Sequence, residues 1–235
     1  MSSVGPTLYT HFTRRSMTIT VVTVPMSTEH QQRLEKLHSR SKWEQTFRAL
    51  NPHKLYALDE ILGAHSGSRI IVFCDVMRAA EIIHATHPNS LLMTGRDRAG
   101  ARDDTLSNFS ANPSGVLICT RICDASINFP PGCVIVQHHL SNASRQQEVQ
   151  RCGRGTRDIS NTMAYMYHIA NGCNDEITYV NRRIQHLHTF MDQDSLTVVR
   201  YTIPFDVQLS DTHLTARERM LIITLPCSRT KSANA

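Results

Sequence analysis

Short, continuous runs of apolar and β-branched residues, each followed by a stretch of helical periodicity, constrain the fold of this chain more than any other feature. Three such runs are residues 69–74, 116–119 and 134–137. Hydrophobicity that continues along a strand, instead of alternating, indicates burial on both faces, as in parallel sheets covered by their crossover helices. The sequence therefore predicts a three-layer α/β fold, with one parallel sheet and helices on both of its faces.

The remaining elements follow from apolar spacing and from capping residues. We expect Ser27, Asn51 and Asp75 to cap helices. Further strands are predicted at residues 17–24 and 90–93, and helices at residues 27–50, 52–62, 75–84, 98–109, 144–153, 163–169 and 177–191. Ligands of such folds bind at the carboxyl ends of the strands, so the loops after Cys74, Met93, Cys119 and Gln137 are the expected location of a site.

The basic residues are mostly arginine. The chain has 25 Lys and Arg against 20 Asp and Glu, and only four of the 25 are lysines. A guanidinium group binds two phosphate oxygens at once, whereas an ammonium group acts as a point charge. The bias indicates a partner that carries phosphate, although the base composition of the source genome would explain it equally well.

Several classes of protein are excluded by the cysteines and by the hydropathy pattern. The seven cysteines are scattered and form no Cys-x-x-Cys pair, which argues against a disulfide framework and against a zinc site, so no metal is expected. A reducing cytosol or nucleus fits this usage. No apolar run approaches the ~20 residues that cross a bilayer, so we expect no membrane partner.

The segment at residues 144–157 is the most informative for chemistry. It holds Arg145, Arg151, Arg154 and Arg157 within thirteen residues, and Gly153 leaves space beside Arg154. On a helix, Arg151 and Arg154 share one face. Such a cluster suits a nucleotide triphosphate, because a guanidinium group can stabilise the charge that develops on a transferred phosphoryl group. The alternative is a solvated basic helix.

Residues 150–157, which read Gln-Arg-Cys-Gly-Arg-Gly-Thr-Arg, resemble motif VI of superfamily 2 helicases. In that resemblance Arg154 and Arg157 take the arginine-finger positions and are the catalytic candidates. Residues 69–75 resemble motif IV, and residues 116–130 resemble motif V. Within the superfamily the likeness is to the XPB type, the TFIIH translocases, and it extends from about Gly5 to about Val199.

The resemblance implies a second RecA-like lobe of an ATP-dependent 3′–5′ DNA helicase or translocase that acts in transcription initiation and nucleotide excision repair. It also implies a nuclear location, subunits of a TFIIH-like complex as partners, and ATP with Mg²⁺ bound at the interface with a first lobe. The implied cofactor-binding residues are Gln150, Arg151, Gly153 and Asn128. The implied DNA-binding residues are Gly95, Arg96, Thr120, Arg121 and His139.

The same resemblance divides the chain into three parts. Residues 1–26 correspond to the end of the first lobe and a linker, residues 27–202 to the RecA-like domain, and residues 203–235 to a partly disordered extension. Motif V departs from the family pattern, because Asn128 replaces an acidic residue and Cys123 stands where a glycine is expected. Asn128 can still form hydrogen bonds to a nucleotide, although it carries no charge.

The sequence contains no G-x-x-x-x-G-K-[ST] segment and no Asp-Glu-x-His box. The backbone cradle for the β- and γ-phosphates and the magnesium ligands are therefore missing, and we expect no activity from this chain alone. A non-catalytic binding module or a gene fragment derived from such a helicase is the alternative. We favour a fragment, because the chain begins within what resembles the end of the first lobe. An upstream Walker A lysine would distinguish the two.

Overall fold

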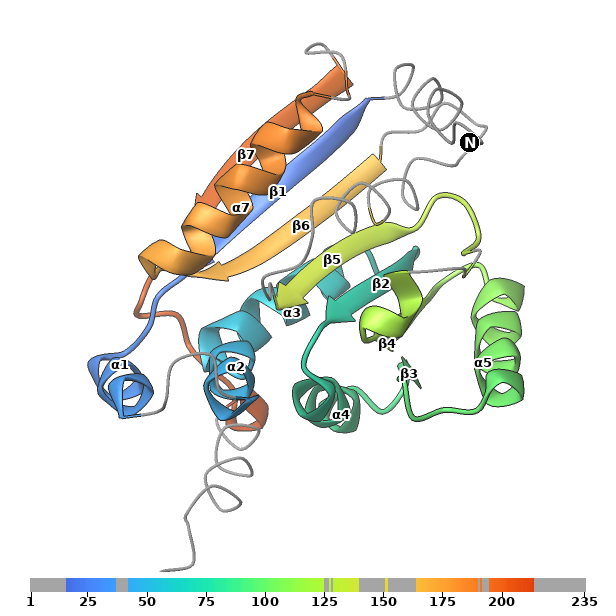
Figure 1. Cartoon of the computed structure of the whole chain (residues 1–235), viewed down its shortest axis with the longest axis horizontal. Coiled ribbons are helices and arrows are strands. Elements are labelled where there is room, and N and C mark those ends of the chain that lie inside the picture. Colours follow the sequence, from blue (N-terminus) through green and yellow to red (C-terminus); the bar gives the residue numbers. More distant parts are fainter. Residues whose placement is uncertain are drawn as a thin grey trace, which may run out of the picture.

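A seven-stranded parallel sheet forms the centre of the chain (Figure 1). The computed structural model describes residues 16–36, 42–124, 127, 129–139, 151, 164–189, 191 and 195–213. The strands are β1 (Met17–Val24), β2 (Arg69–Cys74), β3 (Leu91–Met93), β4 (Gly115–Cys119), β5 (Val134–His139), β6 (Ala164–Asn171) and β7 (Leu196–Thr202). Their order across the sheet is β3-β4-β2-β5-β6-β1-β7, and each neighbouring pair is parallel. The predicted parallel α/β sheet is confirmed.

Helices cover both faces of this sheet, so that two apolar cores form. The helices are α1 (Thr28–Glu35), α2 (Lys42–Ala49), α3 (Pro52–Ala64), α4 (Met77–Thr86), α5 (Ala99–Ala111) and α7 (Asn174–Leu187), with a 3-10 turn η1 (Arg121–Asp124). One core joins α2, α3 and α4 to the sheet through residues such as Phe47, Leu58 and Ile83. The other core joins α5 and α7 to the opposite face through Phe109 and Leu187.

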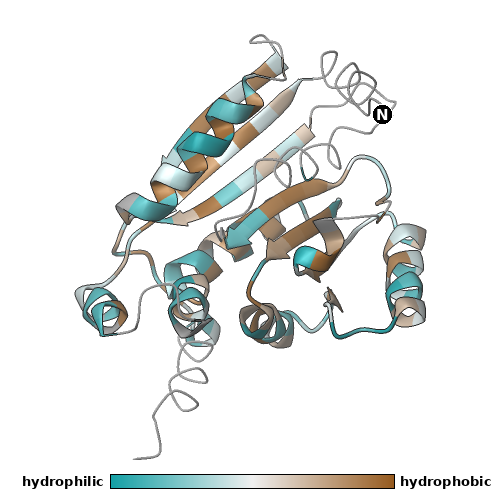
Figure 2. Ribbon diagram, viewed as in Figure 1, coloured by the Kyte–Doolittle hydropathy of each residue, from teal (hydrophilic) through white to brown (hydrophobic). Residues whose placement is uncertain are grey.

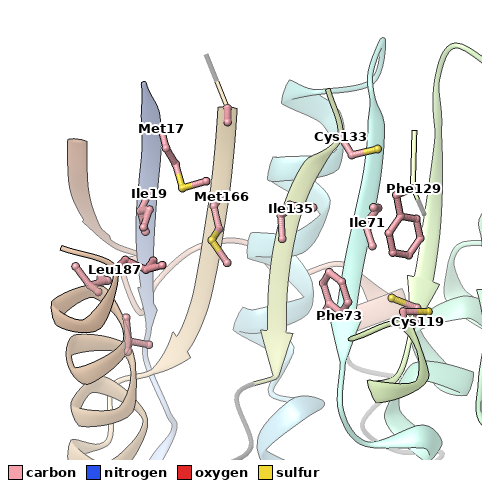
Figure 3. Close-up of a cluster of buried hydrophobic side chains, with 14 of the residues drawn as sticks. Met17, Ile19, Ile71, Phe73, Cys119, Phe129, Cys133, Ile135, Met166 and Leu187 are labelled. Atoms are coloured by element: carbon pink, nitrogen blue, oxygen red, sulfur yellow. The ribbon is translucent and has the colours of Figure 1, made fainter. Parts of the chain in front are cut away.

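The strands are buried as their continuous hydrophobicity predicts. Figure 2 shows the central strands as largely hydrophobic, whereas α7 has a polar side. In Figure 3 the side chains of Ile19, Met166, Ile135 and Phe73, from four different strands, lie in one layer with Leu187 of α7 beside them. None of the described helices is both long and apolar enough to cross a bilayer. The described cysteines, at positions 74, 119, 123, 133 and 173, are all free thiols.

Two of the three predicted helix caps are confirmed, and the third is wrong. Ser27 Oγ accepts a hydrogen bond from the His30 N–H at 3.1 Å, and Asn51 Oδ1 accepts one from the His53 N–H at 3.0 Å. Helix α4 begins later than predicted, with Val76 as its N-cap and with no side-chain bond at that cap. Asp75 does not cap α4, because its carboxylate pairs with arginines at the sheet edge.

The prediction of a helix at residues 163–169 is wrong, because this segment forms strand β6. Burial alternates at its start, where Ala164 and Met166 are buried and Tyr165 is exposed, and the strand pairs with β1 and β5. Strand β7, which the sequence pattern does not reveal, is an edge strand whose burial declines along its length. The charged segment 27–50 contains two helices, α1 and α2, where one was predicted.

Strand β1 lies within the sheet, between β6 and β7. The predicted boundary at residue 27 therefore cuts through the sheet, whose first strand starts at Met17. The stretch after β7 also packs on this unit. The Ile203 N–H donates to the Thr23 carbonyl at 2.9 Å, and the ring of Phe205 lies 5.5 Å from that of His53.

Residue His213 ends the described C-terminal stretch and docks on α3 through a carboxylate that it shares with His87. Asp59 Oδ2 lies 2.6 Å from His213 Nε2, and Asp59 Oδ1 lies 2.7 Å from His87 Nε2. Nδ1 of His87 lies 2.8 Å from the Ile83 carbonyl oxygen, so both ring nitrogens face acceptors. Burial opposes protonation of His87, but the hydrogen bonds to Asp59 and Ile83 outweigh it and raise its pKa. The two histidines in turn lower the pKa of Asp59 against the effect of its burial.

The contacts of Asp59 with His87 and His213 should stabilise the protein most at mildly acidic pH. Because the pKa of His87 is raised on folding, its protonated form stabilises the folded protein fully below about pH 6.5, and this stabilisation is lost as the pH rises through the pKa of the folded state. The pKa of Asp59 is lowered on folding, so the stabilisation by its carboxylate is lost only as the pH falls below about 4. We expect Asp59→Asn to lower the free energy of unfolding by about 0.5 kcal/mol at pH 5.5, since the pair is partly exposed, and by less at pH 8.5. Urea unfolding at both pH values, with exposed Asp104→Asn as control, measures this. An equal loss at both values would contradict it.

Candidate functional site

The carboxyl ends of β3, β4, β2 and β5 meet at one edge of the sheet, because these four parallel strands are neighbours in that order. The segments predicted to contact DNA follow three of them: Gly95 and Arg96 after β3, Thr120 and Arg121 after β4, and His139 at the end of β5. Asp75 follows the fourth strand, β2. The topology thus gathers these predicted positions at the edge where ligands of such folds bind.

The turn after β3 is held in shape by short hydrogen bonds. The Thr94 N–H donates to Asp97 Oδ2 at 2.6 Å, and the Arg96 N–H donates to Thr94 Oγ1 at 3.2 Å. A Cβ atom added at Gly95 would meet nothing within 4 Å, so no crowding inside the chain requires a glycine there. The Arg96 side chain is 70% exposed and pairs with Glu81 at 3.0 Å. The turn therefore presents a guanidinium group beside an open backbone.

The turn after β4 is anchored to the neighbouring strand. The Thr120 N–H donates to the Met93 carbonyl at 3.2 Å, and the Thr120 carbonyl accepts from the Cys123 N–H at 3.1 Å. Cys123, where the family pattern has a glycine, is fully buried, with its sulfur 3.4 Å from that of Met93, so the core accommodates its side chain. Arg121 remains 53% exposed at the start of η1.

Asp75 and Arg151 form a buried ion pair at the centre of this edge. Arg151 Nη2 lies 2.7 Å from Asp75 Oδ1, and both side chains are 1% exposed. Arg151 Nη1 donates to Gln137 Oε1 at 2.9 Å, and the guanidinium carbon lies 4.4 Å from the centroid of the Phe73 ring. A second cation, Arg121, places its Nε 3.5 Å from Asp75 Oδ2. The pair joins the end of β2 to the motif VI segment.

Gln137 extends the cluster to α7. Its Oε1 also accepts a hydrogen bond from Arg183 Nη1 at 3.2 Å. The candidate residues predicted from the sequence did not include Asp75, Gln137, Phe73 or Arg183. A signal was present for two of them, since Asp75 directly follows a buried strand and Gln137 is the first polar residue in an apolar one. Arg183 is 46 residues from Gln137 in the sequence, so no local sequence pattern indicates their contact.

A second buried ion pair lies behind the end of β5. Lys54 Nζ is 2.7 Å from Glu176 Oε2, and these side chains are 0% and 3% exposed. Lys54 also donates to the His138 carbonyl at 3.2 Å, and Asn171 donates to both oxygens of Glu176. Burial by itself would raise the pKa of Glu176. The charges and hydrogen bonds around the carboxylate, those of Lys54 first, together have the larger effect, and the pKa of Glu176 is lowered.

His139 lies inside the lobe, with 2% of its surface exposed. Burial, followed by the charge of Lys54, lowers its pKa to about 4, so the ring is neutral near pH 7. Within the described part of the chain neither ring nitrogen has a hydrogen-bond partner. Unlike Arg96 and Arg121, this residue offers no cationic group at the surface.

The remaining predicted site residues lie outside the described residues: Gln150, Gly153, Arg154, Arg157 and Asn128. The described edge offers the exposed guanidinium groups of Arg96 and Arg121, which can bind phosphate oxygens. Within the described ranges, no three His, Cys, Asp or Glu side chains come together as a metal site. The chemistry that these residues support is anion binding.

Comparison with curated proteins finds helicase/translocase subunits of the XPB type among the relatives of this chain. The chain is 28% identical over 138 residues to the TFIIH basal transcription factor complex helicase/translocase XPB subunit of Trypanosoma brucei brucei. The matched region covers 55% of this chain and 15% of that protein. The chain is 29% identical over 146 residues to the general transcription and DNA repair factor IIH helicase/translocase subunit XPB of Danio rerio, covering 59% and 18%. The chain thus spans less than a fifth of the length of these relatives.

Solved structures share the fold at low sequence identity. Saccharomyces cerevisiae Dbp5 bound to RNA and ADP BeF3 matches 89% of this chain and 45% of its own, with a TM-score of 0.57 and 12% identity. Domain 2 of the DEAD-box helicase Mss116p, bound to an RNA duplex, matches 86% and 68%, with a TM-score of 0.53 and 14% identity. The fold is that of the C-terminal RecA-like domain of such helicases.

A family model matches most of the chain. The model of the ERCC3/RAD25/XPB C-terminal helicase matches residues 12–222, which include all seven strands and the edge that carries Asp75, Arg121 and Arg151. This match includes β1 and the stretch after β7, in agreement with the packing of both on the sheet. The chain therefore belongs to the ERCC3/RAD25/XPB C-terminal helicase family.

Proposed function

We propose that this chain is the second motor lobe of an ATP-dependent 3′–5′ DNA helicase or translocase of the XPB type. The family match over residues 12–222 is the observation that carries the proposal. The nucleotide, with Mg²⁺, binds between this lobe and a first lobe that supplies the phosphate cradle, since this sequence contains no Walker A segment. ATP hydrolysis supplies the energy for movement along DNA.

In this proposal Arg154 and Arg157 extend to the γ-phosphate and stabilise the charge of the transition state. Gln150, Gly153 and Asn128 belong to the same nucleotide-facing surface. The buried pairing of Arg151 with Asp75 supports a role in holding this segment in place instead of direct contact with ATP. The assignments of Gln150, Gly153, Arg154 and Arg157 rest on the resemblance of residues 150–157 to motif VI, and that of Asn128 rests on the resemblance of residues 116–130 to motif V.

The DNA strand lies along the carboxyl edge of the sheet in this proposal. Arg96 and Arg121 bind its phosphates, the open backbone at Gly95 allows close approach, and Thr120 sets the position of the second turn. His139 supports this edge from within the lobe. The XPB relatives are named as TFIIH helicase/translocase subunits, which supports a nuclear role in transcription and repair with TFIIH-like partners.

DNA binding by the 235-residue chain should be weak, indifferent to sequence, and strongly reduced by salt. Arginines that neutralise phosphates release counterions, so the logarithm of the association constant falls linearly with the logarithm of the salt concentration. We expect Arg121→Gln to reduce the magnitude of that slope by about 1. Arg200→Gln, on strand β7 at the other side of the sheet, is the matched control and should leave the slope unchanged.

Fluorescence anisotropy of a labelled single strand, titrated between 50 and 200 mM salt, measures this slope. A family of sequences of equal length tests for indifference to sequence. An affinity that stays constant over this range, or an equal effect of the Arg121 and Arg200 variants, would contradict the proposed DNA-binding edge.

A further inference from the structure

The carboxylate of Asp75 contacts two arginines that the proposed function places at different ligands. Its Oδ1 lies 2.7 Å from Nη2 of Arg151, and its Oδ2 lies 3.5 Å from Nε of Arg121. Arg151 belongs to the motif VI segment, which carries the proposed arginine fingers, and Arg121 belongs to the proposed DNA edge. One buried negative charge is therefore shared between the nucleotide side and the DNA side of the lobe.

The contacts of Arg151 hold its side chain in one position. The Arg151 side chain is 1% exposed, is hydrogen-bonded to Gln137 at 2.9 Å, and stacks over the ring of Phe73 at 4.4 Å. Gln137 is held in turn by Arg183 of α7 at 3.2 Å. Arg154 follows Arg151 by three residues, so roughly 10 Å of chain at most separates their Cα atoms. The place of Arg151 therefore limits where the proposed finger can reach.

The contact with Arg121 is different in kind. It is longer, at 3.5 Å, and the arginine is 53% exposed, so solvent and ions can reach the guanidinium group. Exposed ion pairs are weak, and a DNA phosphate is a competing anion with the same charge as a carboxylate. A DNA phosphate that binds Arg121 would draw it from Asp75. The buried carboxylate would then interact with Arg151 more strongly, because a competing cation has been removed.

We propose that Asp75 is a positioning residue that couples DNA contact at Arg121 to the placement of the arginine-finger segment through Arg151. The inference rests on the proposed function, because it assigns Arg121 to DNA and Arg154 to ATP. DNA binding strengthens the Asp75–Arg151 pair, and a firmly held Arg151 fixes the point from which Arg154, three residues further on, reaches ATP. By thermodynamic linkage, ATP bound by Arg154 also favours release of Arg121 to DNA.

The coupling makes an unusual prediction for Arg121→Gln in a two-lobed protein that carries this sequence. With Arg121 removed, Asp75 keeps its pair with Arg151, without competition from Arg121, whether or not DNA is present. We expect the ATPase rate without DNA to rise several-fold toward the stimulated rate, and the ratio of stimulated to unstimulated kcat to fall several-fold. A simple DNA contact predicts instead an unchanged basal rate and a higher DNA concentration at half-stimulation. A purely structural role predicts that both rates fall.

Asp75→Asn is the complementary variant, with Asp75→Glu as its conservative rescue. The amide cannot hold Arg151 by charge, so kcat at saturating DNA should fall at least tenfold with little change in the KM for ATP, and Glu should restore part of the loss. Arg200→Gln, distant from this edge, should match the wild-type protein in both rates. An unchanged stimulation ratio in Arg121→Gln would overturn the coupling even if Asp75→Asn fails to fold.

A second measurement needs no ATPase activity. The Arg151 guanidinium resonances of the 235-residue chain, followed by NMR during addition of single-stranded DNA, should shift in the wild-type chain although Arg151 is buried, and should not shift in Arg121→Gln. Resonances that stay still in a wild-type chain with bound DNA would also refute the coupling. A wild-type two-lobed protein without DNA-stimulated hydrolysis would refute the proposed function itself, which separates the two failures.

Discussion

Arg154→Lys should lower the DNA-stimulated ATPase rate of a two-lobed protein that carries this sequence at least ~100-fold, since arginine fingers contribute roughly 10³ to 10⁵ in turnover. Lysine keeps the positive charge but loses the planar fork that binds two phosphate oxygens. The melting temperature and most of the DNA affinity should change little. Steady-state ATPase assays with thermal unfolding of the same samples provide the measurement.

The control for this variant is Arg145→Lys, at the start of the predicted helix 144–153 that precedes Arg154. Its effect on turnover should be far smaller, because Arg145 has no proposed contact with ATP and a substitution on a solvated basic helix changes stability by little more than ~0.5 kcal/mol. If both variants hydrolyse ATP at the wild-type rate, or if both lose activity only by unfolding, the finger assignment fails. The cluster would then be a surface for DNA or for a protein partner.

Lys54→Met should destabilise the chain by about 3–5 kcal/mol, the loss that follows when a buried ion pair is broken by removal of one partner. The carboxylate of Glu176 is 3% exposed and would remain without its cation. Among the described residues, Asn171 would still donate hydrogen bonds to it. The loss should shrink as pH falls, since the folded protein without Lys54 favours the protonated acid. Urea unfolding monitored by circular dichroism provides the measurement.

Two further variants separate charge burial from loss of packing. Lys54→Met combined with Glu176→Gln removes both charges and keeps an oxygen that can accept from Asn171, so most of the stability should return. Arg78→Met breaks an exposed pair with Glu81, whose side chains are 48% and 29% exposed, and should change stability by less than about 0.5 kcal/mol. A double variant as unstable as Lys54→Met alone would show that packing of the lysine stem is the main contribution.

The sequence predicts those parts of the fold that depend on local signals. Strand β2 after Arg69 and the first three residues of β5 are continuous apolar runs, and Ser27 and Asn51 are caps whose partners lie within three residues. Strand β6 was assigned as a helix because its apolar residues fit either period, and only pairing with β1 and β5 decides between them. Tertiary pairing overrides local preference in such short segments.

The candidate site shows the same division. Arg96 and Arg121 follow strand ends, where the fold predicts a ligand site and the family resemblance implies contact with DNA. Asp75 was assigned as a cap because a carboxylate before a helix usually has that function. Its partners, Arg151 and Arg121, come from segments far along the chain, and a single sequence gives no direct sign of which acid meets which base.

The place of β1 between β6 and β7 affects how the chain folds as it is made. Met17 pairs with Ala164 on one side and with Leu196 on the other, so the first strand of this sheet along the sequence has both of its partners among the last described strands. Contacts of such long sequence separation form slowly. Until β6 and β7 emerge, Ile19, Val21 and Val24 of β1 have no sheet to enter, and unpaired apolar strands of this kind are prone to aggregate. During synthesis β1 therefore remains open to aggregation until β6 and β7 have been made.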